Sequence, residues 1–426
     1  MILVLDYAKI QVRNILSRIT PLLTEWIYAE NGAAVLFALL GFLLRIPIIS
    51  SHFPASGVSS AGCWLVAALI SLYFCRDEKL PSSLLFLVLF AAYVSVVSLT
   101  SNWASISMLF TRLATIVGAS LFAICDRKHF QRTSFLFSAL TMVLLIADIL
   151  SVLAFPRGIF DTGTGPSWIL GYKNLRADFL ILMIAVVSVQ FSMQRSRENL
   201  AFLIAASITS LVDLALCKST SGVAGVAVEI LVIVAALSFP KSSNVLRRFW
   251  AFFAVYIAIF FMVVVFRDSD FVRNVMAVIF QKDPTLTGRT AIWNGCLFAI
   301  EQTGQLGLGA IPAPLYFEVT GGFYNAHNQI VDIALLGGIP GTALYFLFVG
   351  TTMGSACMTD RNKPLCIAIY SMLIIGIVSG IFTYSPLFYY LLFSIEPEGE
   401  ETGFIDSLAQ KERHPKARVQ SEKIKR

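Results

Sequence analysis

Charged residues are scarce in this sequence, and so are the motifs of common soluble enzymes. Asp, Glu, Lys and Arg make up only 14% of its 426 residues, against 57% hydrophobic residues. Soluble domains carry about 25% charged and about 45–50% apolar residues. The seven cysteines show no CxxC spacing, and no P-loop, GxGxxG or HExxH pattern is present. These absences exclude a secreted disulfide scaffold and a cytosolic nucleotide-binding enzyme, and they leave no recognisable zinc site.

The hydrophobic residues are collected in long runs, and the mean hydropathy is +0.76. A spanning helix needs about 20 mainly apolar residues to cross a hydrocarbon core of about 30 Å. We therefore predict an all-α, polytopic integral membrane protein with about 12 transmembrane helices. The candidate runs lie at 33–49, 60–75, 80–99, 106–125, 134–155, 177–193, 200–217, 223–239, 249–266, 329–356, 365–382 and 387–395, of which the last is the shortest.

Basic residues indicate which side of the membrane each connector faces. If the N-terminus is cytoplasmic, every short inner connector contains Lys or Arg, whereas the outer connectors 50–59, 100–105 and 383–386 contain none. The positive-inside rule then predicts that both termini lie in the cytoplasm. The net charge of +6 is explained by this orientation, so we expect no nucleic-acid partner.

The chain divides into three parts. Residues 1–31 are expected to lie along the cytoplasmic surface, because Lys9 and Arg13 interrupt their apolar positions. Residues 32–395 form the transmembrane domain. Residues 396–426 are polar and are predicted to be a disordered cytoplasmic tail.

The two longest outer connectors are 156–176 and 267–328. The second contains Ile292, Trp293 and other apolar residues at helical spacing, which predicts an amphipathic helix over 290–302 at the outer interface. This large outer connector either caps the bundle or forms part of a site, because connectors of such length are usually functional.

Polar residues on the predicted outer face fall into four clusters. The clusters contain Lys173, Asn174 and Arg176; Lys218; Arg289; and His327 with Asn328. Arg presents a planar fork to phosphate oxygens, and a helix N-terminus adds oriented N–H groups. Arg289 meets both conditions if a helix begins at Thr290, which predicts a site for a diphosphate. The alternative is an arginine that only contacts solvent or lipid headgroups.

His327 is one of only four histidines, and His suits general acid–base work near neutral pH. Asp332 follows five residues later, where it either orients His327 or caps local backbone. The alternative for His327 itself is an interfacial side chain that anchors the helix.

Besides Asp332, the ionisable residues within the apolar runs include Arg45, Arg112, Asp148, Asp213 and Glu229. Such residues normally face the interior of a helix bundle. We expect Arg112 to form a structural ion pair with one of the three acidic residues. The alternative is a proton relay in a secondary transporter or flippase.

Several segments resemble one family, that of the O-antigen ligases and O-antigen polymerases. Residues 326–341, AHNQIVDIALLGGIPG, are similar to its His-Asn…Asp…Gly-x-x-Gly signature. Residues 286–293, LTGRTAIW, resemble a motif of its exopolysaccharide-polymerase branch. Weaker similarities lie at 171–174, 216–220 and the GLG of 307–309. Tyr172 replaces the family's histidine, and no arginine follows Lys218 and Ser219.

The resemblance implies a GT-C-like glycosyltransferase of the bacterial inner membrane that needs neither metal nor other cofactor. Its donor would be a glycan on undecaprenyl diphosphate, presented in the periplasm. Arg289 would bind the diphosphate, and His327 would either lie at the donor or take the proton from the acceptor hydroxyl. The other residues expected at the substrate are Lys173, Asn174, Arg176, Lys218, Asn328 and Asp332.

A polymerase of repeat units for exopolysaccharide or O-antigen is the function that the resemblance favours. It would work beside a flippase and a chain-length regulator. The alternative within the family is a ligase that transfers finished glycan to lipid A core, for lipopolysaccharide, or to a protein.

Overall fold

The computed structural model describes residues 31–74, 80–102, 104–161, 165–173, 176–238, 249–266, 269, 289–323, 326–354, 362–377 and 385–395. The tail predicted at 396–426 and nearly all of the N-terminal segment predicted at 1–31 lie outside these residues.

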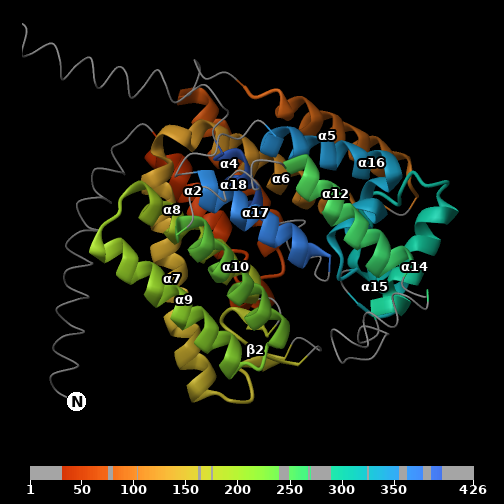
Figure 1. The fold of residues 1–426 in the computed structure, drawn as a ribbon. Helices are drawn as coiled ribbons and strands as arrows, with labels where there is room; N and C mark the ends of the chain where they lie inside the picture. Colours follow the sequence, from red (N-terminus) through yellow and green to blue (C-terminus); the bar gives the residue numbers. More distant parts are fainter. Residues whose placement is uncertain are drawn as a thin grey trace, which may run out of the picture.

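Helices dominate the described part of the chain (Figure 1), and each of the twelve apolar runs contains one. They are α2 (Gly32–Leu43), α3 (Pro47–His52), α4 (Ser56–Phe74), α5 (Ser83–Thr100), α6 (Ile106–Asp126), α7 (Phe130–Ala154), α8 (Arg176–Met193), α9 (Arg197–Leu216), α10 (Thr220–Ser238), α12 (Phe249–Phe260, continued by a π-helix at Phe261–Val265), α14 (Arg289–Gln302), α15 (Ala313–Val319), α16 (Gln329–Gly354), α17 (Asn362–Gly376) and α18 (Pro386–Phe393).

The first run is broken, although its pattern predicts one helix over 33–49. α2 ends at Leu43, and α3 begins at Pro47. Ile46 is extended, with ψ of 129°, because a residue before proline is driven out of the helical region. The helix therefore stops before the proline and starts again with it.

Five helical stretches are long and apolar enough to cross a membrane, one of which, Ile106–Ala154, joins α6 and α7. The protein is therefore a multi-pass, all-α membrane protein, while the number of twelve spans stays a prediction. As described, α18 has eight residues and rises only about 12 Å. It does not cross a bilayer by itself.

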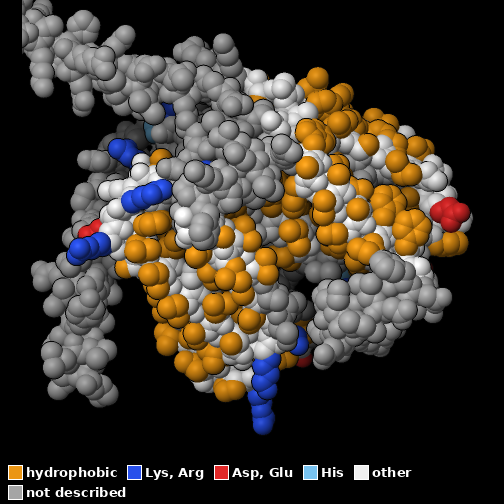
Figure 2. Space-filling model, viewed as in Figure 1, with side chains coloured by type: hydrophobic (Ala, Val, Ile, Leu, Met, Phe, Trp, Pro, Cys, Tyr) orange, Lys and Arg blue, Asp and Glu red, His pale blue; other side chains and the backbone are white. Residues whose placement is uncertain are grey.

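Large apolar side chains cover much of the outside, and Figure 2 shows them over a broad part of one face. On α5, Leu85 is 60% and Leu99 is 70% exposed. In contrast, the side chains of α18 are all buried, and so are most of those on α17. Helices that are apolar on every side belong in the interior or in lipid, so α17 and α18 form the centre of the bundle.

The connector at 156–176 contains a small antiparallel sheet, which the helical prediction does not include. Its strands are β1 (Phe160–Asp161), β2 (Pro166–Trp168) and β3 (Gly171–Tyr172). Ser167 pairs with both Phe160 and Tyr172. These strands have two or three residues each, too few to show the alternation by which strands are recognised.

Hydrogen bonds join alternate helix ends at one pole of the bundle, which we call the Asp126 end. Asp126, at the end of α6, accepts from Asn31 before α2, from Thr133 in the first turn of α7 and from Tyr390 of α18, at 3.2, 3.0 and 2.9 Å. Ser71 near the end of α4 donates to Asn31 at 3.0 Å. The ends gathered here belong to one side in the predicted alternation of spans.

The opposite pole, which we call the His327 end, gathers one end each of α5, α6, α8, α9, α16 and α17. Asn328 before α16 donates to Ile377 O at 2.8 Å, just after α17. Arg176 at the start of α8 contacts Asp213 near the end of α9. Ala310 contacts the ends of α5 and α6 through Ser98 and Ser105. All four outer clusters of the predicted topology belong to this end.

Candidate active site

His327 lies in the short connection between α15 and α16, and its backbone is held from two sides. Trp293 Nε1 of α14 donates to Ala326 O at 2.9 Å, and Ala326 N–H donates to Asp332 Oδ1 of α16 at 2.9 Å. The backbone of His327 has φ of 49°, in the left-handed region that residues other than glycine rarely adopt. The half-buried imidazole meets the Phe323 ring edge-on at 5.7 Å. Its position is therefore imposed by α14 and α16 together.

Asp332 acts on His327 through the backbone. Its Oδ1 accepts from both Ala326 N–H and the Tyr316 hydroxyl of α15. Its Oδ2 has no hydrogen-bond partner among the residues that the structure describes. Of the two roles that the sequence leaves open, these contacts favour the backbone cap. Tyr316 carries no signal in the sequence, because α15 is too short to show a pattern.

Asn328 also has a structural task, at the start of α16. Its Oδ1 accepts from Val331 N–H at 3.0 Å, the usual contact of an N-cap residue, while its Nδ2 donates to Ile377 O. The side chain is fully buried. These contacts favour a cap that fixes the start of α16 over the predicted contact with substrate.

Arg289 is the first residue of α14, one position earlier than the predicted helix start. It is half-buried, and burial lowers the pKa of its guanidinium. Burial and, to a lesser extent, the nearby positive charge of Arg289 lower the pKa of His327 to about 4. The imidazole is therefore neutral at pH 7. Within the described part of the chain, no carboxylate forms an ion pair with Arg289.

A break in α16 connects this region to the GLG segment. Gly338 has φ of 60°, and Pro340 has no N–H, so Leu335 O and Leu336 O lose their helical donors. Leu308 N–H and Gly309 N–H replace these donors, at 2.7 and 3.0 Å. The two glycine motifs of the sequence thus meet backbone to backbone.

Lys218 lies in the turn between α9 and α10 and is exposed. Its φ is 55°, and two hydrogen bonds, Lys218 N–H to Ala215 O and Ser219 N–H to Leu214 O, at 3.0 and 2.9 Å, form a Schellman motif. Glycine is the usual residue at this position. The turn directs the chain so that a lysine stands at the His327 end.

Lys173 directly follows β3 and is half-buried. Its ammonium lies 5.6 Å from the ring centre of Tyr172. Asn174, the next predicted site residue, lies outside the described residues.

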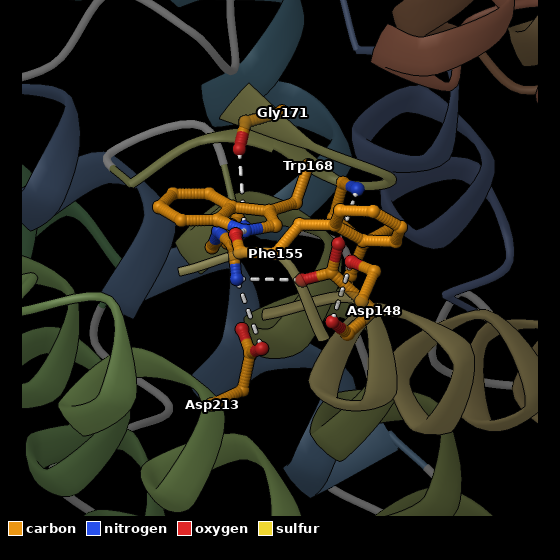
Figure 3. Close-up of polar contacts among 8 residues, drawn as sticks. Asp148, Phe155, Trp168, Gly171 and Asp213 are labelled. Carbon is orange, nitrogen blue, oxygen red and sulfur yellow. Dashed lines mark hydrogen bonds and ion pairs between the residues drawn. The ribbon is translucent and has the colours of Figure 1, made fainter. Parts of the chain in front are cut away.

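Arg176 is fully buried and bound to protein groups. Figure 3 labels the residues that surround its side chain, namely Asp148, Trp168, Gly171 and Asp213. Its Nη1 lies 2.6 Å from Asp148 Oδ2 and 2.9 Å from Asp213 Oδ1, and its Nη2 donates to Gly171 O at 3.2 Å. The guanidinium also lies 5.0 Å from the Trp168 ring centre. These contacts favour a structural role over the predicted contact with a diphosphate.

The expected pairing of Arg112 with one of the three acidic residues of the apolar runs is wrong. Asp148 and Asp213 pair with Arg176, because α8 begins between α7 and α9 and its first side chain reaches both. The Arg112 guanidinium instead lies 5.7 Å from the ring centre of Tyr316. Neither oxygen of Glu229 has a hydrogen-bond partner among the described residues.

The structure thus brings the predicted residues together in two groups at the His327 end. One group contains Arg289 and His327, and the other contains the segments of Lys173 and Lys218. The end of α17 lies between them, because Ile377 contacts Asn328, and Ile375 packs against Gly225 of α10.

Comparison with known proteins relates one part of the chain to a known family. Residues 205–346 match a family model described as O-Antigen ligase, and this range contains Lys218, Arg289, His327 and Asp332. No curated protein and no solved structure matches the chain. This match confirms the resemblance over residues 205–346, which are similar to the superfamily of O-antigen ligases and O-antigen polymerases.

Proposed function

We propose that this protein is a membrane glycosyltransferase that polymerises undecaprenyl-diphosphate-linked repeat units on the periplasmic face of the bacterial inner membrane. The observation that carries the proposal is the pairing of a half-buried Arg289 with a neutral His327 inside the residues that match the family. Both termini lie in the cytoplasm in this proposal, which follows the distribution of Lys and Arg.

The reaction transfers the glycan from its diphosphate to a hydroxyl of the acceptor. The acceptor oxygen forms a bond to the anomeric carbon of the donor, and the bond between that carbon and the diphosphate oxygen breaks. The diphosphate leaves with the electron pair, and the hydroxyl proton passes to His327. A neutral imidazole is the form that accepts a proton.

Arg289 stabilises the departing diphosphate. A guanidinium donates two parallel hydrogen bonds to phosphate oxygens, and the free N–H groups in the first turn of α14 favour an anion at the same place. Lys173 and Lys218 add positive charge at the His327 end and attract the donor. A cationic site of this kind supplies the charge that a metal supplies in other transferases.

A ligase is the second candidate, and the description of the matched family favours it. The segment 286–293 favours the polymerase, because it resembles the polymerase branch. Both enzymes use the same donor and differ in acceptor. Loss of a polymerase leaves single repeat units on the carrier lipid, whereas loss of a ligase leaves long chains there.

The test is complementation of a deletion strain with Arg289→Ala and His327→Ala, read as the length of surface polysaccharide and of lipid-linked glycan. We expect both variants to leave single repeat units on lipid. Arg157→Ala and His52→Ala are matched controls, because both residues are exposed and lie outside the range that matches the family. Normal polymer from both site variants, correctly inserted, would contradict the assignment.

A further inference from the structure

Three ionisable side chains, Asp148, Arg176 and Asp213, form a fully buried cluster at the His327 end. They come from α7, α8 and α9, and a single nitrogen, Arg176 Nη1, serves both carboxylates at 2.6 and 2.9 Å (Figure 3). Three helices therefore depend on one guanidinium for their relative placement.

The cluster also holds the two segments that carry Lys173 and Lys218. On the first segment, Arg176 Nη2 binds Gly171 O of β3, and the guanidinium lies against the Trp168 ring of β2. On the second, Asp213 lies in the last turn before Lys218. Trp168 packs with Val152 and with Cys217, the neighbour of Lys218. The sheet and the turn of α9 are thus attached to each other through this cluster.

The charges of the cluster do not balance if both carboxylates are ionised. Two carboxylates and one guanidinium would leave a net negative charge in an interior that is fully shielded from water, which is costly. A proton on one carboxyl group makes the cluster neutral.

The two aspartates are not equivalent. Asp148 accepts a hydrogen bond from Leu170 N–H at 2.8 Å in addition to its ion pair with Arg176. Asp213 accepts a hydrogen bond from Arg176 and none from a backbone N–H among the described residues. The second oxygen, Oδ2, has no hydrogen-bond partner in the described part of the chain on either aspartate, although that of Asp148 lies 2.6 Å from Arg176 Nη1. Donors stabilise the ionised form of a carboxyl group, so Asp148 holds the negative charge better.

We propose that Asp148, Arg176 and Asp213 are positioning residues for the lysines that attract the donor diphosphate, with Asp148 ionised and Asp213 carrying a proton. The positioning role rests on the proposed function, whereas the protonation state does not. The ionised Asp148 and the neutral Asp213 both bind the guanidinium of Arg176, which also binds the sheet. The sheet and the α9 turn are held together in this way. Lys173 and Lys218 lie on these two segments, at the same end of the bundle.

The protonation state is tested on the purified protein by infrared spectroscopy of Asp148→Asn and Asp213→Asn. Asn has nearly the shape of a protonated Asp, so we expect Asp213→Asn to lose the C=O stretch of a protonated carboxyl group and to melt like the unchanged protein. Asp148→Asn leaves a single carboxyl group beside Arg176, so the same charge balance ionises Asp213, and this variant should lose the band as well. It should melt at a lower temperature, because Asn cannot hold the negative charge that Leu170 N–H and Arg176 stabilise at this position. Equal melting temperatures, a melting temperature lowered by Asp213→Asn instead of Asp148→Asn, or a band that survives in Asp213→Asn would overturn the proposed proton on Asp213.

The positioning role is tested by the donor concentration that gives half-maximal rate. We expect about a tenfold increase for Asp148→Asn and less than about twofold for Asp213→Asn. Combining Asp148→Asn with Lys218→Ala should be no worse than the more impaired single variant, because both changes act on the same lysine. Multiplied effects would overturn the positioning role.

Two controls separate these outcomes from others. Asp126→Asn weakens an equally buried polar cluster at the opposite end, so it should lower the melting temperature without changing the donor requirement. If Asp148→Asn does not fold, Trp168→Leu replaces it as the test of the positioning role, because it leaves both aspartates in place. We expect this variant to raise the donor concentration for half-maximal rate by a few fold. Unaltered activity in Arg289→Ala and His327→Ala would contradict the proposed function. The infrared result on Asp148 and Asp213 does not depend on that outcome.

Discussion

At the scale of single residues, the proton affinity of His327 decides how the site works. Burial and the positive charge of Arg289 lower the pKa of this imidazole to about 4. A weakly basic imidazole stays unprotonated well below neutral pH, but it gains basicity when a diphosphate offsets the charge of Arg289. In the proposed reaction, donor binding would therefore raise the basicity of His327 toward the acceptor hydroxyl.

The pH dependence of the donor-limited rate tests this coupling. This rate reports the protonation state of the protein before the donor binds. It should stay constant as pH falls from about 8 and decrease only near pH 4, where His327 becomes protonated. Arg289→Gln removes the positive charge, so the pKa of His327 rises, and the acidic limb of the residual activity should move toward the ordinary value of 6.5. An unmoved limb would show that the charge of Arg289 does not act on His327.

Lys218 combines a strained backbone with an exposed charge. A side chain in the left-handed region costs about 1–2 kcal/mol, so Lys218→Gly should raise the free energy of unfolding by about 1 kcal/mol. The same variant loses an ammonium group, and its half-saturating donor concentration should rise. Lys218→Ala is the control, because it removes the charge and keeps the strain. Equal melting temperatures for the two variants would contradict the strain.

The residue types of the site could be predicted from the sequence, but their partners could not. His327 and Arg289 stand out because His is rare in this chain and because both lie in recognisable motifs. The pairing of Arg176 with Asp148 and Asp213 depends on how α7, α8 and α9 pack, which no spacing along the chain encodes. The contacts of Tyr316 and Trp293 with the connection around His327 likewise depend on helix packing, so they could not be predicted either.

At the scale of elements, the break in α16 sets the position of the first half of this helix, which begins directly after His327 and Asn328. The outer half of α16 carries Asp332 and follows Asn328, and the break at Gly338 gives this half its own direction. The segment around Gly307 stabilises the break by donating to the carbonyl groups that it exposes. The close approach of two backbones explains why glycines stand on both sides.

Gly307→Ala tests this contact. A Cβ at Gly307 would overlap backbone atoms of Gly337 and Gly338, and φ there is 90°, so we expect a loss of at least about 2 kcal/mol in stability. Gly304→Ala is the matched control, because Gly304 also has positive φ, at 60°, but has no atom within 4 Å of an added Cβ. It should lose only about 1 kcal/mol. Equal losses in thermal melting would contradict the packing argument.

Helix positions could be predicted well, and short elements could not. All twelve apolar runs contain helices because hydrophobic length is a strong signal. The three strands and α15 are shorter than any period that a pattern reveals. The gap between α2 and α3 is hidden from a hydropathy pattern, because Pro47 interrupts the helix without interrupting the apolar run.

At the scale of the whole molecule, the contacts divide the helix ends between two poles. The Asp126 end holds a hydrogen-bonded polar cluster, and the His327 end holds the family motifs, the lysines and the Arg176 cluster. Apolar side chains face outward between them (Figure 2). This division follows the alternation predicted from the apolar runs, and it places Arg289, His327 and the two lysines of the proposed site at one end.

The most direct test of this account is the release of undecaprenyl diphosphate from purified, lipid-linked repeat units by the protein in liposomes. The unchanged protein should release one carrier diphosphate for every new glycosidic bond, without added metal. Arg289→Ala and His327→Ala, inserted and folded, should slow this release by at least about a hundredfold. Release at the unchanged rate from both variants would contradict the central claim that these two residues act on a diphosphate-linked donor.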